Sequence, residues 1–212
     1  MAHADVFELG AMQKFLFVLF GGSGIGKEGY EARSRSIVPI FEPLLQEFDR
    51  RSMEFVMVYV TSPYDVPYNR FVSEPEALAA WNKHITTELL ESWNSLPMFI
   101  SGFSGGAALA FNGLEKETRC FGGGTFGGDQ IPLSFVRPKH WPVKLRLYST
   151  PNDWVSKHPA NRNIAERLVA GGHAELIQLR TGKHSLSNYC TMDGLGALIR
   201  IADEQAQALN QG

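Results

Sequence analysis

The segment at 98–111, MFISGFSGGAALAF, places a serine where its hydroxyl can become reactive. Gly102-Phe103-Ser104-Gly105-Gly106 is a GxSxG pattern between a short apolar run and a run of small residues with helical character. A serine at a sharp strand-to-helix turn needs small residues two positions away on either side, because strand and helix nearly collide there. Gly102 and Gly106 meet this need, and the Gly105 N–H would point at a developing oxyanion. The pattern predicts a serine nucleophile.

A serine attacks a carbonyl only when a base takes its proton. His184 is the candidate base because, among six histidines, it alone follows an apolar run, 174–180, in a polar turn, TGKHSLSN. Asp153, in the turn-forming sequence PND after the run at 143–149, is the candidate acid that would orient the imidazole and stabilise its protonated form. Asp129 is an alternative acid. Asp153 could instead be an ordinary turn aspartate, and His184 could be a surface histidine with no catalytic role.

The elements that must position these residues are short apolar runs alternating with stretches of helical spacing. The expected strands lie at 14–20, 53–60, 97–101, 118–123, 143–149 and 174–180. They lack clean alternation, as strands covered on both faces should. The expected helices lie at 78–93 and 195–209, and in 31–51, where Pro39 and Pro43 predict a kink or a late start.

Strands that alternate with helices predict a mainly parallel sheet of about six strands with helices on both faces. The expected fold is therefore an α/β three-layer sandwich formed by a single domain, 1–212. In such sheets the chemistry lies at the carboxyl ends of the strands. The loop at 64–68, YDVPY, would lie on that side and border the cleft, or it is an ordinary surface turn.

The chain resembles the α/β-hydrolase family from Lys14 to Leu209, with nucleophile, acid and base in that family's order. The resemblance implies that the glycine-rich turn after 14–20 supplies a second oxyanion-hole N–H, from Gly22 or Ser23, beside that of Gly105. The family often has His-Gly where this chain has Gly21-Gly22, so the choice of donor stays open. The short spacing from nucleophile to acid implies an open cleft, with neither a cap domain nor a full-sized helix before 143–149.

The resemblance also implies a two-step acyl transfer on Ser104 that needs no metal and no organic cofactor. The expected substrate is a small-molecule ester or thioester with a short or medium acyl group; an amide is less favoured on family grounds alone. The residues expected to line the pocket are Phe103, Phe126, Trp154 and Leu186, although each is also a candidate for the core. A catalytically idle binding module with the same fold is the alternative function.

The glycine-rich segment FGGSGIGKEG, residues 20–29, admits two further interpretations. Gly21 to Lys27 fits the spacing of a phosphate-binding loop, but Glu28 stands where a serine or threonine should bind magnesium. Gly24, Gly26 and Gly29 fit a dinucleotide fingerprint, without an acidic ribose partner at a strand end. Both nucleotide interpretations are weaker than the hydrolase.

Composition and charge limit which partners and which cellular location the sequence predicts. The net charge is −2, the pI is near 6.3, and no cluster of Lys and Arg is present to bind a polyanion, so nucleic acid is not an expected partner. No apolar run could span a bilayer, and the amino-terminal residues have no signal-peptide pattern, which predicts a cytoplasmic protein. Cys120 and Cys190 are expected to be reduced thiols without a zinc site. The natural substrate and the oligomeric state are left open.

Overall fold

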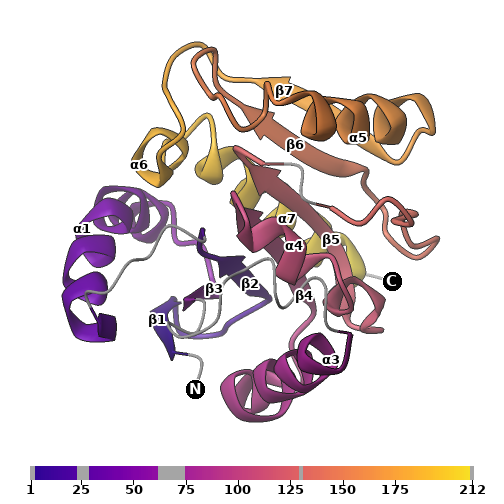
Figure 1. Cartoon of the computed structure of the whole chain (residues 1–212). Helices are drawn as coiled ribbons and strands as arrows, with labels where there is room; N and C mark the ends of the chain where they lie inside the picture. The colour runs from indigo at the N-terminus through magenta and orange to yellow at the C-terminus, as the bar shows by residue number, and fades with distance from the viewer. Residues whose placement is uncertain (1–2, 23–28, 62–74, 129–130, 211–212) are drawn as a thin grey trace.

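A computed structural model describes residues 3–22, 29–61, 75–128 and 131–210. A seven-stranded sheet forms its centre, in the order β1-β3-β2-β4-β5-β6-β7 (Figure 1). The strands are β1 (His3–Leu9), β2 (Leu16–Phe20), β3 (Phe55–Thr61), β4 (Met98–Phe103), β5 (Cys120–Phe126), β6 (Leu145–Ser149) and β7 (Ala174–Gln178). Every neighbouring pair is parallel except β1 and β3, which are antiparallel. The predicted mainly parallel sheet is confirmed, with β1 as one strand more than expected.

The central strands are buried on both faces, which explains their continuous apolar runs. All five residues of β2 are buried, and they alternate between the two sides of the sheet. Val18 belongs to one core cluster, whereas Phe17 and Leu19 belong to the other. The sheet therefore separates two cores, and each core needs its own layer of helices.

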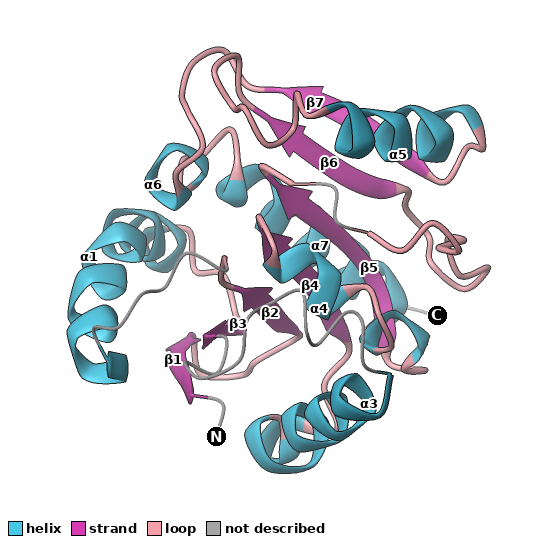
Figure 2. Cartoon of the chain, viewed as in Figure 1, coloured by secondary structure: helices cyan, strands magenta, loops and turns pink. Residues whose placement is uncertain are grey.

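Helices supply those two layers (Figure 2). The helical elements are α1 (Gly29–Arg50), α3 (Pro75–His84), the π-helical turn η1 (Ile85–Leu89), the 3-10 turns η2 (Glu91–Trp93) and η3 (Leu114–Lys116), α4 (Gly106–Ala110), α5 (Pro159–Ala170), α6 (Leu186–Tyr189) and α7 (Leu195–Asn210). Apolar residues of α1 and α7 pack in one core cluster, and those of η1, α4 and α5 pack in the other. Figure 1 shows α4 in front of the central strands and α7 behind them. The three-layer arrangement agrees with the prediction.

Three elements differ from the expectation. The helix α1 does not start late: it begins at Gly29 and passes through Pro39 and Pro43, whose side chains are exposed. The helix α5 and the strand β1 were not predicted. Between β5 and β6, the described residues form turns and no helix, as the short spacing there predicts. No helix in the described part of the chain is long and apolar enough to cross a membrane.

Candidate active site

Ser104 occupies the sharp turn between β4 and α4. Its φ is +53°, in the left-handed region where a residue with a side chain is strained. Two backbone hydrogen bonds hold this conformation: the Ser104 N–H donates to the Phe126 carbonyl at 2.8 Å, and the Ala107 N–H donates to the Ser104 carbonyl at 3.1 Å. A Cβ atom at Gly106 would collide with the carbonyl oxygen of Phe20. The turn therefore requires the small residues that the sequence provides.

The structure brings the three predicted site residues together at the carboxyl ends of β4, β6 and β7. His184 Nε2 lies 3.0 Å from Ser104 Oγ, and His184 Nδ1 lies 3.0 Å from each oxygen of Asp153. A carboxylate only accepts hydrogen bonds, so Nδ1 carries the proton and Nε2 is free to accept the proton of Ser104. The side chain of Asp153 is fully buried and that of His184 is 13% exposed. A continuous hydrogen-bonded chain thus runs from a buried acid to a serine hydroxyl.

Asp153 is surrounded by donors. Its Oδ1 accepts the backbone N–H groups of Val155 at 2.9 Å and Ser156 at 3.1 Å, and its Oδ2 accepts the hydroxyl of Tyr189. Burial alone raises the pKa of Asp153, but hydrogen bonds from His184, Tyr189 and Ser156 outweigh burial and bring the pKa below its ordinary value. The carboxylate is therefore ionised at neutral pH and can stabilise a protonated imidazole.

Two of the four residues predicted to line the pocket lie beside His184. The Phe103 ring stacks on the imidazole with centroids 5.0 Å apart, and the Trp154 ring meets it edge-on at 5.7 Å. Trp154 is 71% exposed, which leaves most of its indole available for contact.

The other two predicted pocket residues lie in the core. Phe126 is 1% exposed and stacks on Tyr148, and Leu186 is 7% exposed within the same cluster. Both side chains are enclosed by other core residues. Their burial agrees with the core reading that the sequence also allowed, and their place in a pocket stays a prediction.

Gly22 and Gly105 are the predicted oxyanion-hole donors that the structure describes, and that role stays a prediction. A Cβ atom at Gly22 would be 3.3 Å from Ser104 Cβ, which shows how closely this turn approaches the serine. Within the described part of the chain, neither the Gly22 nor the Gly105 N–H donates to a backbone or side-chain oxygen. The other predicted donor, Ser23, lies outside the described residues, as do Asp129, the loop 64–68 and the phosphate-loop residues 23–28.

Sequence reasoning missed Gly127 and Gly128, which follow β5. Gly127 has φ +61°, and a Cβ atom there would be 2.5 Å from Asp153 Oδ2 and 2.9 Å from His184 Nδ1. A Cβ atom at Gly128 would be 2.9 Å from Ser104 Cα. The run GGGTFGG at 122–128 is the signal in the sequence that marks this close approach.

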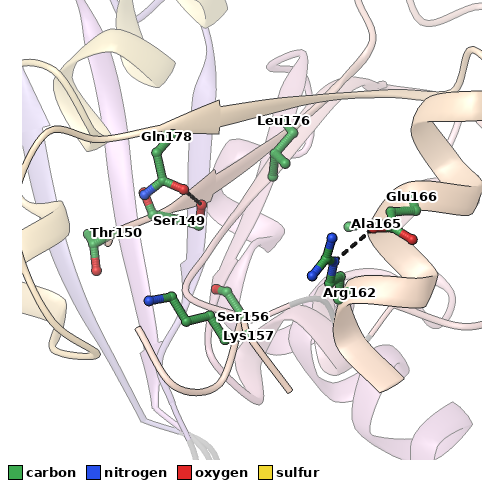
Figure 3. Close-up of a pocket in the computed structure, with 9 residues that line it drawn as sticks. All are labelled: Ser149, Thr150, Ser156, Lys157, Arg162, Ala165, Glu166, Leu176 and Gln178. Carbon is green, nitrogen blue, oxygen red and sulfur yellow. Dashed lines mark hydrogen bonds and ion pairs between the residues drawn. The ribbon is translucent and has the colours of Figure 1, made fainter. Parts of the chain in front are cut away.

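A cavity of about 490 Å³ lies near the loop that carries Asp153 (Figure 3). It is lined by Ser149, Thr150, Ser156, Lys157, Arg162, Ala165, Glu166, Leu176 and Gln178. Arg162 is paired with Glu166 at 2.8 Å across its wall. None of Ser104, Asp153 and His184 lines this cavity, so it is distinct from the space above the serine.

The sheet order, the strained serine and the order of the three residues define the α/β-hydrolase fold. Solved structures agree: the chain is similar to esterase PE8, with a TM-score of 0.65, 16% identity, and coverage of 96% of this chain and 98% of that one.

Two further solved structures share the fold. One is the enterochelin esterase of Shigella flexneri, with a TM-score of 0.63, 14% identity, and coverage of 92% and 54% of the two chains. The other is a cold-adapted esterase from an Arctic intertidal metagenomic library, with a TM-score of 0.55, 13% identity, and coverage of 94% and 92%. At such identities the likeness shows the fold. No family model and no curated protein matches the sequence.

Proposed function

We propose that the protein is a serine hydrolase that cleaves carboxylic esters or thioesters through an acyl-enzyme on Ser104. The observation that carries the proposal is the hydrogen-bonded chain from Ser104 Oγ through His184 to Asp153, with each contact at 3.0 Å. The strained turn that presents the serine supports it. The names of the similar solved structures, which are esterases, point to the same bond type.

The proposed first step forms the acyl-enzyme. His184 Nε2 takes the proton of Ser104 as Oγ bonds to the substrate carbonyl carbon, and the carbonyl oxygen becomes an oxyanion bound by the N–H groups of Gly22 and Gly105. Asp153 stabilises the protonated imidazole meanwhile. The imidazole then gives its proton to the departing alcohol or thiol as the bond from the acyl carbon to that group breaks.

The proposed second step returns the enzyme to its starting state. His184 takes a proton from water while the water oxygen bonds to the acyl carbon. The bond from the acyl carbon to Oγ then breaks, the acid leaves, and Ser104 regains a proton from His184. Every proton is carried by His184, so the proposal requires neither a metal nor an organic cofactor.

The side chains beside the imidazole favour an apolar substrate. Phe103 and the exposed ring of Trp154 present aromatic surface next to His184. We therefore propose a small or medium acyl group on a small molecule as the substrate, in the cytoplasm.

A fluorophosphonate probe tests the proposal because it reacts with serines that are activated as nucleophiles and leaves ordinary serines unmodified. We expect mass mapping to place the label on Ser104, Ser104→Ala to abolish labelling, and His184→Ala to slow it by roughly a thousandfold. The exposed residues Ser134 and His158 provide matched controls, since Ser134→Ala and His158→Ala should label at the wild-type rate. A folded wild-type protein that resists the probe would contradict the mechanism and favour a binding module.

A further inference from the structure

Tyr189 is a buried tyrosine whose hydroxyl reaches the proposed acid. It is the last residue of α6, five positions after His184, and its side chain is fully buried. The hydroxyl donates a hydrogen bond to Asp153 Oδ2. The proposed mechanism gives this tyrosine no proton to move and no substrate atom to contact, so the bond requires another explanation.

The donors around Asp153 are divided between its two oxygens. Oδ1 accepts the N–H groups of Val155 and Ser156, which are fixed by the backbone. Oδ2 accepts the hydroxyl of Tyr189. His184 Nδ1 is equally distant from both oxygens. Donors on both oxygens oppose rotation of the carboxylate plane, so Tyr189 completes the set that holds Asp153 facing His184.

The tyrosine ring is itself held by the site. It packs against Phe103 at 5.9 Å and Phe126 at 5.7 Å between ring centroids, and Phe103 stacks on His184. Gly127 leaves room for it, because a Cβ atom there would be 3.0 Å from Tyr189 Cε2. Burial raises the pKa of Tyr189, the bond to Asp153 raises it further, and Thr150 offsets only part of this. The hydroxyl therefore remains a donor at any working pH.

We propose that Tyr189 is a positioning residue that fixes and partly neutralises the Asp153 carboxylate, and thereby sets the pH at which His184 can act as a base. The inference rests on the proposed function, because it gives Tyr189 a role through His184. Without the hydroxyl, negative charge on Oδ2 is no longer shared with a donor. Asp153 then holds a protonated imidazole more tightly, and the base becomes available only at higher pH.

Among the residues that the structure describes, few other charges act on Asp153 and His184. In the described part of the chain, the titratable groups that contact Asp153 are His184 and Tyr189, and its other donors are uncharged backbone N–H groups. Ser104, Phe103 and Trp154 surround the imidazole and carry no charge at neutral pH. Lys183 precedes His184 in the chain but is exposed to solvent. A change in the pH response can therefore be assigned to the Tyr189 hydroxyl.

Tyr189→Phe removes only the hydroxyl, and Tyr148→Phe is its matched control. Tyr148 is 3% exposed, lies in the same core cluster and packs on the same Phe126 ring. We expect Tyr189→Phe to slow fluorophosphonate labelling of Ser104 roughly tenfold and to move the acid limb of its pH profile upward by about half a pH unit. Tyr148→Phe should leave both unchanged. An unchanged rate and acid limb in Tyr189→Phe, or equal effects in both variants, would overturn the proposal.

A second readout separates this proposal from the proposed function. The midpoint of imidazole titration, followed by NMR with the His184 signal assigned through His184→Ala, requires no turnover. If the wild type resists the probe while Tyr189→Phe moves that midpoint upward, the hydrolase fails and the role of Tyr189 stands. If the midpoint does not move, the role of Tyr189 fails.

A third measurement applies if Tyr189→Phe does not fold. Replacing all six tyrosines with 3-fluorotyrosine keeps each ring close to its native size and makes each hydroxyl a stronger donor. The His184 midpoint must then move downward. An unmoved or raised midpoint would contradict the role of Tyr189.

Discussion

Gly127 shows how little room the acid and base have at the scale of single residues. It combines a positive φ with contacts on both Asp153 and His184 that no side chain could share. Gly172, in the turn before β7, has a similar φ of +72°, but a Cβ atom there would meet nothing within 4 Å. A substitution at Gly172 would therefore cause backbone strain alone, whereas one at Gly127 would cause strain and a collision with Asp153 and His184.

We predict that Gly127→Ala lowers the rate of Ser104 labelling at least about a hundredfold, since its methyl group must push the carboxylate or the imidazole aside. Gly172→Ala carries comparable strain, costing about 1 kcal/mol, and should label normally. Labelling rates and urea denaturation of both variants measure the two effects. Equal labelling by the two variants would show that Gly127 does not control the geometry.

The sequence predicted some of the site residues better than others, for physical reasons. Ser104, Asp153 and His184 could be found because each follows an apolar run, and parallel strands bring their carboxyl ends together. Tyr189 could not, because its role depends on how α6 places the ring against Phe126 of β5 and the hydroxyl on Asp153. The sequence left Phe126 open between pocket and core, because the side of a sheet that a strand residue faces depends on register, and the structure buries it.

At the scale of elements, α1 is notable for continuing through two prolines. The apolar residues Phe41, Leu44 and Phe48 are buried in the core, whereas Pro39 and Pro43 face solvent. Each proline removes a backbone hydrogen bond and crowds the preceding turn. Packing of the buried face therefore outweighs the preference of the prolines. The sequence pattern predicted a kink or a late start because it shows the prolines but not this packing.

We predict that Pro43→Ala raises the free energy of unfolding by about 2 kcal/mol. The substitution restores a helical hydrogen bond, and the greater freedom of the unfolded chain offsets only part of that gain. The exposed neighbour Glu42 provides the control, since Glu42→Ala should change stability by less than about 0.5 kcal/mol. Urea denaturation followed by circular dichroism measures both. A stability equal to or below that of the wild type would mean that the proline is already accommodated without cost.

The missed elements had weak patterns. The strand β1, HADVFEL, contains two acidic residues and leaves Val6 44% exposed, as befits an edge strand with one covered face. In α5, only Ala165 and Leu168 are buried, so its apolar stripe is too narrow to recognise. Buried strands and helices with a broad apolar face can be predicted from the sequence. Elements at the edge of the sheet have weaker patterns, because their structure depends on packing against neighbouring elements.

At the scale of the whole molecule, one sheet joins two cores. Cys120 lies in one core cluster and Cys190 packs against the other, so each thiol reports on a different layer. Burial raises the pKa of both thiols, which disfavours the reactive thiolate while the chain is folded. The prediction of a single domain requires that both layers unfold together.

We predict that pulsed alkylation across a urea gradient modifies Cys120 and Cys190 at one common midpoint, which also matches the loss of circular dichroism. The β-strands that separate the two clusters contribute side chains to both, so we expect that neither layer opens alone. Peptide mass analysis distinguishes the thiols. Two separate midpoints would divide the chain into independently unfolding parts.

The spacing of the site along the chain also affects how the protein is made. Ser104 is synthesised 80 residues before the histidine that would activate it, and Asp153 is 31 residues before that histidine. A nascent chain that already contains Ser104 therefore still lacks the base that would accept its proton. If Ser104 is the nucleophile that we propose, we expect it to stay unreactive on the ribosome and to become reactive only when β7 and the turn that carries His184 join the sheet.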